Sequence, residues 1–446
     1  MKINKVDVIW NYAATFLKIA ASTLLLPFML RLLSPETVGI WSVFVTINSL
    51  VLLFDFGFNP SFTRSITYIL IGMQKLQAKG FSYIDANEMM EVDYGLLKAV
   101  LKAMQWFYLR ISIIFFLLLS TFGTFYIYTL LKNYHSSHIE VYVAWGLLCI
   151  INTFNLSSIY YDSLLQGKGL VKKSKQIIII SQAVYLLTAA ILIIAGKGLI
   201  AIVAAQGTSV VIVRWLSHRL FFTKDIKDKM DKAEAHSKDD IFKAIYPNAV
   251  KIGLTTLGTF MVQRSAIIIG SLYLTLQEIA SYGISMQIIA LIAGMASIYT
   301  ATYHPKIVSL RVQGDRRSIK NIYTRGLFIF IATYIIAGAC MVLIGNPVLH
   351  FIGSKTELLM PSMLFLALLL SLEQTNFLIA GNILATKNEV PFFKSSLISG
   401  AAIILGLIIS FHFFNSGIAC MLVVPIIIDI AYQAWKWPKE LAEDLK

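Results

Sequence analysis

Three charged side chains lie inside long apolar stretches of the 446-residue sequence: Lys18, Arg264 and Glu373. A charge at the centre of a membrane-spanning helix costs about 2.5–3.5 kcal/mol on insertion scales, so each one needs a function or a partner. A buried lysine or arginine can bind phosphate, and a buried carboxylate can exchange a proton or pair with a cation. These residues therefore predict an anion-binding site within a membrane, accompanied by a carboxylate that couples transport to an ion or balances charge.

Lys18 shares one face of its predicted helix with polar residues at a spacing of i, i+4, i+7 and i+11: Asn11, Thr15, Lys18 and Ser22. Snorkelling toward the membrane surface is the alternative for a single lysine, but from the middle of a span both surfaces are nearly equidistant. We therefore expect this face to line a protein interior or water, and its side chains to bind substrate.

Arg264 has Gln263 beside it in the outward half of another apolar stretch. The planar guanidinium can donate two parallel hydrogen bonds to a phosphate, whereas a lysine contributes a mobile point charge. We expect both side chains to contact an anionic substrate. An internal ion pair between Arg264 and Glu373 is the competing interpretation, and the sequence leaves both open.

Glu373 stands in a polar cluster within LFLALLLSLEQTNFLIAGNIL, together with Gln374, Asn376 and Asn382. A carboxylate in this position either exchanges a coupling ion, H+ or Na+, as access alternates, or balances a buried cation. We predict one of these two roles for Glu373 and Gln374. Other carboxylates lie near the inner ends of predicted spans, where a wet interface or a nearby basic residue would stabilise them: Asp55, Asp162 and Asp429.

Signatures of catalysis and of cofactor binding are absent from the sequence. No GxxxxGK[ST] phosphate loop is present, and the seven histidines form neither an HExxH motif nor an i, i+4 pair. The three cysteines lie in apolar runs without the spacing of a disulfide framework or a zinc site: Cys149, Cys340 and Cys420. We therefore predict no catalytic residue, no metal site and no cofactor.

The elements that must position these residues are membrane-spanning helices. The chain is 57% hydrophobic and 14% charged, with a mean hydropathy of +0.72, which leaves too little polar surface for a water-soluble globule. A helix needs about 20 apolar residues to cross the hydrocarbon core. Twelve stretches qualify and predict an all-α membrane protein: 8–30, 38–58, 107–130, 140–163, 176–195, 198–218, 247–272, 280–303, 322–345, 360–382, 395–413 and 417–435.

The distribution of Lys and Arg predicts the orientation of the chain. If both termini lie inside, the inside segments hold 32 of the 38 Lys and Arg residues and the outside turns hold four. Because basic loops are translocated poorly, this asymmetry places both termini in the cytoplasm of a bacterial cell, with the spans in the inner membrane. The formal net charge of +14 thus reflects orientation, and we expect no nucleic-acid partner.

A charged linker, residues 223–243, divides the spans six and six and predicts two lobes, 1–222 and 244–446. Its six lysines and six acidic residues are typical of a solvated segment. The halves are faintly similar at an offset of 241, which would relate them about an axis normal to the membrane, with a cleft between them. Under this offset Leu33, Val38 and Trp41 fall on Leu274, Ile279 and Tyr282, and Arg264 falls five residues beyond the equivalent of Lys18.

A second inside segment, residues 82–105, has apolar residues at helical spacing after two capping residues, Ser82 and Asp85. This pattern predicts either an amphipathic helix lying on the inner leaflet or an ordinary cytosolic loop helix. The sequence leaves the two alternatives open.

Several segments together resemble a known family. They are the opening NYAATFLKIAASTLLLPFMLRLLSPETVGIWSVF, the segment DFGFNPSFTRS at Asp55–Ser65, the turn QGKGLVKKS and the basic linker at the midpoint. In this order they resemble the Wzx-type O-antigen flippases, the polysaccharide-transporter branch of the multidrug/oligosaccharidyl-lipid/polysaccharide (MOP) exporter superfamily. The inside insertion 72–106 is longer than this resemblance leads us to expect.

The resemblance implies two six-helix bundles around a V-shaped central cavity. It implies a flippase that moves an undecaprenyl-diphosphate-linked oligosaccharide, a surface-polysaccharide or O-antigen repeat unit used in lipopolysaccharide biosynthesis, from the inner to the outer leaflet by alternating access. Lys18 and Arg264 match the cavity cations of the family, and a polysaccharide polymerase and chain-length proteins would be partners. A multidrug/cation antiporter of the same fold, dependent on Glu373, is the alternative. A glycan polymerase or acyltransferase would need a large outside loop, which the spans do not leave.

Overall fold

The computed structural model describes residues 25–73, 91–234, 236–387, 392–414 and 417–446. These residues are helical throughout, without a β-strand, and contain eleven helical segments long and apolar enough to cross a membrane. Each of the eleven coincides with a span predicted from hydropathy, while the remaining one, 8–30, lies mostly outside the described residues. The spans of the structure are Pro35–Asp55, Tyr94–Leu130, His138–Gly167, Val171–Ile194, Gly198–Phe221, Ala249–Gly270, Leu276–Ala296, Arg316–Phe351, Pro361–Lys387, Phe393–Phe413 and Ile418–Asp444.

Contacts divide the chain into two compact units. Among the described residues, the first unit comprises 25–29 and 47–256, and the second comprises 30–46 and 257–446. The boundaries fall inside two helices, α2 (Pro35–Asn48) and α12 (Lys238–Gly270), and not in the linker 223–243. The division into symmetry-related halves at that linker stays a prediction.

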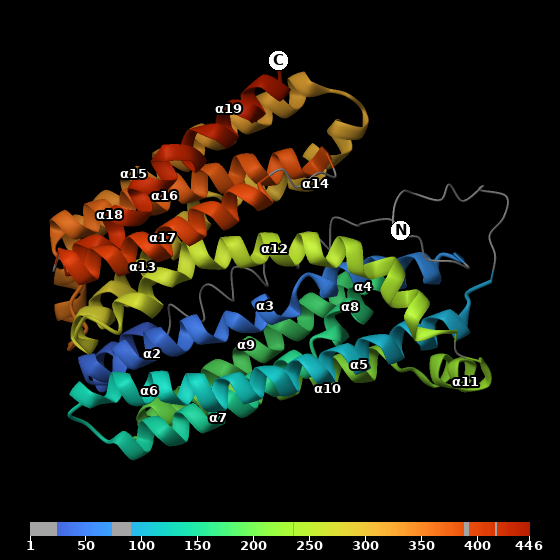
Figure 1. Ribbon diagram of the computed structural model, residues 1–446, viewed down its shortest axis with the longest axis horizontal. Coiled ribbons are helices and arrows are strands. Elements are labelled where there is room, and N and C mark those ends of the chain that lie inside the picture. The colour runs from blue at the N-terminus through green and yellow to red at the C-terminus, as the bar shows by residue number, and fades with distance from the viewer. Residues whose placement is uncertain (1–24, 74–90, 235, 388–391, 415–416) are drawn as a thin grey trace. The chain divides into compact units, whose positions relative to one another are not determined.

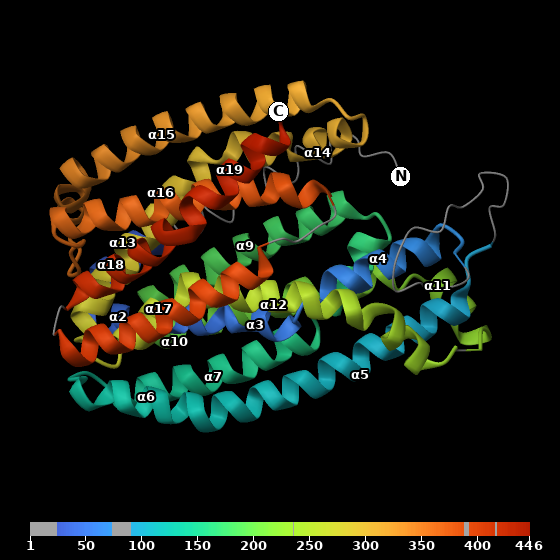
Figure 2. The same ribbon diagram turned by 45° about the horizontal axis from the view of Figure 1, so that its top comes forward.

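The first unit is built on long antiparallel helices that lie side by side (Figures 1 and 2). Helix α10 packs along α9 and α7, and α5 packs along α7, while the short helices α4 and α8 contact each other. The helices are α3 (Leu50–Asp55), α4 (Phe58–Leu70), α5 (Tyr94–Leu118), α6 (Thr124–Leu130), α7 (His138–Ser157), α8 (Tyr160–Gly167), α9 (Val171–Ile194), α10 (Gly198–Phe221) and α11 (Lys224–Lys232).

The second unit places α16 at its centre, in contact with α13, α15, α18 and α19. Prolines and a wider π-helical turn interrupt its last span, in which Pro425 is followed by the π-helical segment Asp429–Gln433. The helices are α13 (Leu276–Ala296), α14 (Ile298–Val312), α15 (Arg316–Phe351), α16 (Pro361–Leu384), α17 (Phe393–Phe413), α18 (Ile418–Ile428) and α19 (Ala434–Asp444).

Helix α2 packs closely on α13 within the second unit because glycines stand at the contact. A Cβ atom on Gly39 would lie 2.1 Å from the carbonyl oxygen of Leu276, and one on Gly283 would lie 2.3 Å from the Ser42 hydroxyl. The first obstacle is backbone, and the second includes the Ser42 Cβ at 2.5 Å, so neither is relieved by rotating a side chain. Thr275 starts α13 at this point with a capping box to Glu278.

The Gly39→Ala substitution is therefore expected to destabilise the protein by about 1–3 kcal/mol, the usual cost of overpacking a fitted contact. Thermal unfolding of the purified protein measures the effect. Gly146→Ala is the matched control, since nothing lies within 4 Å of a Cβ atom at that position of α7. Equal unfolding temperatures for the two variants would mean that the α2–α13 contact is not tight.

The segments 82–105 and 223–243, both predicted to lie on the inside, differ in structure from what their sequence patterns predict. Helix α5 begins at Tyr94, is capped by the Asp93 carboxylate and runs on through a π-helical segment into α6, so the described part of 82–105 extends a span and is not a separate interfacial helix. The capping residues Ser82 and Asp85 lie outside the described residues. The linker is not simply solvated, because Ile226 and Met230 of α11 are buried and α11 contacts α5. The charge pattern alone did not predict that these two apolar side chains are buried.

Candidate functional site

A cavity of about 450 Å³ lies within the second unit, between α2, α12, α13 and α16. Its lining combines hydroxyl and amide side chains with small apolar ones, and it holds one cation and no carboxylate among the described residues. The lining residues are Ser42, Val45, Thr46, Gln263, Arg264, Ile267, Tyr282, Gly283, Met286, Gln287, Ala290, Ala293, Gly294, Ser297, Ser371, Gln374, Thr375 and Leu378.

Arg264 is the cation of this cavity. Both Arg264 and Gln263 are exposed on α12 and line the cavity, and their contact with a substrate stays a prediction. Within the described part of the chain Arg264 has no ion-pair partner, and the structure shows no bridge from it to Glu373. Its guanidinium is therefore open to an anion that enters the cavity.

The four polar residues predicted to share a helical face lie outside the described residues: Asn11, Thr15, Lys18 and Ser22. Their participation in the site remains a prediction from the sequence.

Gln374 and Glu373 connect the cavity to a second carboxylate, that of Asp429. Gln374 lines the cavity, and its side-chain amide donates to Asp429 Oδ2 over 3.1 Å. Glu373 lies within electrostatic reach of Asp429, and its Oε2 is buried without a hydrogen-bond partner. The structure thus joins the cavity, through one glutamine, to a pair of acidic side chains.

Asp429 was expected at a wet interface or beside a basic residue, and that expectation is wrong. The side chain is fully buried, it starts the π-helical turn of the last span, and its Oδ1 has no hydrogen-bond partner. An aspartate in the apolar run IIIDIAY, without a lysine or arginine in the preceding turn, was the available signal. Burying an ionised carboxylate with one oxygen unpartnered is energetically costly.

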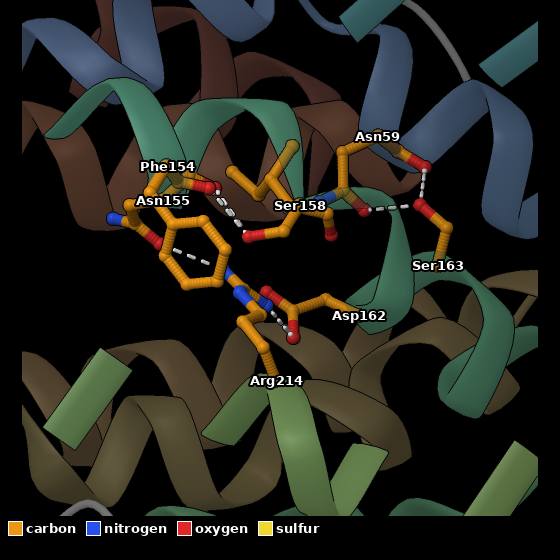
Figure 3. A network of polar contacts seen from close by, with 8 residues as sticks. Asn59, Phe154, Asn155, Ser158, Asp162, Ser163 and Arg214 are labelled. Atoms are coloured by element: carbon orange, nitrogen blue, oxygen red, sulfur yellow. Dashed lines mark hydrogen bonds and ion pairs between the residues drawn. The ribbon is translucent and has the colours of Figure 1, made fainter. Parts of the chain in front are cut away.

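A separate polar network lies in the first unit (Figure 3). Arg214 on α10 is buried and donates to Asp162 Oδ1 over 2.9 Å and to Asn155 Oδ1 over 2.7 Å. This pair confirms the predicted basic partner for Asp162. Nearby, the Ser163 hydroxyl donates to Asn59 Oδ1 over 2.6 Å.

Asp55 belongs to the same region, but it is buried and has no basic partner among the described residues, so the expectation of a wet interface or a basic partner is wrong for it as well. Its Oδ1 accepts a hydrogen bond of 2.6 Å from the hydroxyl of Tyr108, which is itself buried. The carboxylate also accepts from the backbone N–H of Asn59 at the start of α4. Directly after it, Phe56 and Gly57 have positive φ angles of 49° and 73°, which break the helix between α3 and α4. The network therefore fixes a bend in the second span.

Arg214→Met is expected to destabilise the first unit by about 3 kcal/mol, the lower end for removing one member of a buried ion pair. The lower end applies because the Asp162 side chain is 36% exposed and regains some solvation. Thermal unfolding is the measurement. The double variant Arg214→Met/Asp162→Leu should recover part of the loss, and a double variant no more stable than the single one would contradict the pairing.

Comparisons with known proteins place the fold. No protein-family model matches the sequence, and no curated protein is similar to it. A multidrug resistance MATE family transporter of the MOP superfamily, in an inward-facing conformation, is similar over 96% of this chain and 95% of its own, with 14% identity and a TM-score of 0.63. The lipid II flippase MurJ, inward closed, matches over 98% and 88%, with 13% identity and a TM-score of 0.60.

The chain has the MOP transporter fold. A third MOP transporter, from Pyrococcus furiosus and described as having a binding pocket of reverse polarity, matches over 99% of both chains with 15% identity and a TM-score of 0.57. At these identities the likeness establishes the fold and leaves the substrate open. The MOP fold and the eleven described spans make the protein a multi-pass membrane protein.

Proposed function

We propose that the protein is a flippase for a lipid-linked oligosaccharide, an undecaprenyl-diphosphate-linked repeat unit of O-antigen or another surface polysaccharide. The observation that carries this proposal is the composition of the cavity in the second unit. It offers one unpaired guanidinium, Arg264, among neutral hydrogen-bonding side chains and holds no carboxylate among its lining residues. Such a lining favours an anionic, hydroxyl-rich head group.

Each part of the substrate has a matching chemistry. The guanidinium donates two parallel hydrogen bonds to the diphosphate, with Lys18 as the second cation predicted from the sequence. The amides of Gln263 and Gln287 and the hydroxyls of the lining hydrogen-bond sugar hydroxyls. The polyprenyl tail needs no protein site, because lipid solvates it.

The multidrug/cation antiporter is the rival function, since MATE transporters share the fold. A carboxylate in the cavity would strengthen the binding of a cationic drug, whereas Arg264 would repel it. Glu373 and Asp429 do not line the cavity, and Gln374 stands between it and Asp429. The lining therefore favours an anionic substrate over a cationic one.

The same proposal gives the acidic pair a role in energising transport. Glu373 and Asp429 would exchange H+ or Na+ as access alternates, and Gln374 would transmit their state to the cavity. On the orientation predicted from Lys and Arg, both termini lie on the cytoplasmic side of the inner membrane. There the flippase would receive its substrate at the inner leaflet and deliver it to a polymerase and chain-length proteins.

Transport in proteoliposomes tests the substrate. The purified protein is expected to move a short-chain polyprenyl-diphosphate saccharide between leaflets and to leave a cationic dye where it is. Complementation of a flippase-null strain by the wild-type gene gives a second readout. Drug resistance on expression, without complementation and without saccharide movement, would establish the antiporter instead.

A further inference from the structure

A basic patch lies on the first unit where α8, α9 and α10 contact one another, with α11 following α10 directly along the chain. We define it by Lys168 in the turn after α8, Lys173 in the first turn of α9, Lys227 on α11, and His218 and Arg219 in the last turn of α10. No acidic residue occurs in the sequence between Asp162 and Asp225. The ends of α8 and α10 and the start of α9 thus contribute cations to one area without supplying carboxylates, while α11 adds Lys227 together with Asp225 and Asp228.

The cations of the patch stand close together without ion-pair partners in the described part of the chain. The Lys168 ammonium lies 5.5 Å over the ring of Phe221. Burial, with the neighbouring Lys173 ammonium, lowers the pKa of Lys168, while Asp225 acts on it in the opposite direction. Lys227 lies within electrostatic reach of His218. The nearest acid, Asp225, is engaged by Lys229 at 3.0 Å. Like charges crowded in this way are stabilised by an anion from outside the chain.

The aromatic side chains around the patch place it at the level of lipid head groups. Trp215 is 50% exposed and stands six residues before the end of α10, and the Arg219 guanidinium lies 3.9 Å over its ring. The His218 ring packs against Phe222 and Tyr161. Tryptophan and tyrosine gather at the boundary between hydrocarbon and water, where lysine and arginine reach phosphate groups.

We propose that this basic patch binds the head-group phosphates of anionic phospholipids at the membrane surface, and that it is a lipid site separate from the cavity around Arg264. On the predicted orientation this surface is the inner leaflet. The proposal does not depend on which substrate the cavity carries. A soluble phosphate offers the same charge, but it lacks the acyl chains that would lie against the exposed face of Trp215.

Native mass spectrometry of the full-length protein with phosphatidylglycerol tests the proposal, with phosphatidylcholine as the zwitterionic comparison. The Lys168→Gln/Lys173→Gln/Lys227→Gln variant is expected to bind phosphatidylglycerol about tenfold more weakly than the wild type, since each surface lysine adds to the attraction. The matched control, Lys102→Gln/Lys320→Gln/Lys439→Gln, removes three exposed lysines elsewhere and should bind as the wild type does.

Three results would overturn the lipid site: equal loss in the control variant, equal binding of the two lipids by the wild type, or displacement of bound phosphatidylglycerol by inorganic pyrophosphate at similar concentration. The last result would assign the patch to a soluble phosphate. Should the triple variant fail to fold, the single exposed substitution Lys173→Gln, with Lys173→Arg as its charge-retaining partner, decides the question by the same assay.

Discussion

Arg264→Gln is expected to slow movement of a diphosphate-linked saccharide about 30- to 150-fold, because a hydrogen bond to a charged group contributes about 2–3 kcal/mol. The guanidinium lines the cavity without an ion-pair partner among the described residues, so its loss leaves the diphosphate without its strongest donor there. Initial rates in proteoliposomes give the measurement. Arg264→Lys should retain an intermediate rate, since it keeps the charge and loses the planar pair of donors.

Arg325→Gln is the matched control for Arg264→Gln. This arginine is exposed on α15 and does not line the cavity, so its removal changes the net charge equally and should leave the rate unchanged. An uncharged polyprenyl saccharide gives an internal comparison, because its movement should not depend on Arg264. If Arg264→Gln moves the diphosphate substrate at the wild-type rate and with the same apparent affinity, the anion site is elsewhere.

The spans could be predicted from the sequence because hydropathy depends on local composition and length. The interruptions could not, because tertiary contacts impose them. The break at Phe56 and Gly57 packs against Ile252 and Gly253 of α12, and a Cβ atom on Gly253 would lie 2.5 Å from the Phe56 ring. Similarly, α5 starts well before its apolar stretch because Asp93 caps it and the linker packs on it, with the Lys98 ammonium donating to the Ala233 carbonyl.

The site could be predicted in part. Residue type and depth pointed to Arg264 and Gln263 as substrate contacts, and to Gln374 as the companion of Glu373 in ion coupling or charge balance. The structure brings these three residues to one cavity, and their roles stay predictions. Asp429 was misjudged because distance along the sequence to the end of a span was taken as distance to water. The π-helical turn at Asp429 aims the carboxylate at α16, and a helix of regular pitch drawn from the sequence contains no such turn.

Glu373→Gln and Asp429→Asn are each expected to abolish the response of transport to an imposed ion gradient. One ion moved per cycle across 100 mV supplies about 2.3 kcal/mol, so loss of coupling lowers the driven accumulation of substrate up to about fiftyfold. Uncoupled movement between leaflets should continue, because neither carboxylate lines the cavity. Imposing a proton gradient and a sodium gradient separately identifies the ion. Glu357→Gln, which removes an exposed carboxylate between α15 and α16, is the control.

Gln374 decides whether the acidic pair acts on the cavity or only stabilises the fold. Among the described residues, its amide donates the hydrogen bond that connects the cavity lining to Asp429, so Gln374→Leu should leave ion binding to the pair intact and still abolish the gradient response. If the pair is purely structural, substitutions at Glu373, Gln374 and Asp429 should lower the unfolding temperature and the protein yield. The protein that does fold should then keep its response to the gradient. π-helical turns occur often where a side chain must be aimed at a functional partner, and the buried, unpartnered Oδ1 of Asp429 requires a proton or a cation in either case. If Gln374 couples the pair to the cavity, binding and release of that ion can drive transport of the substrate.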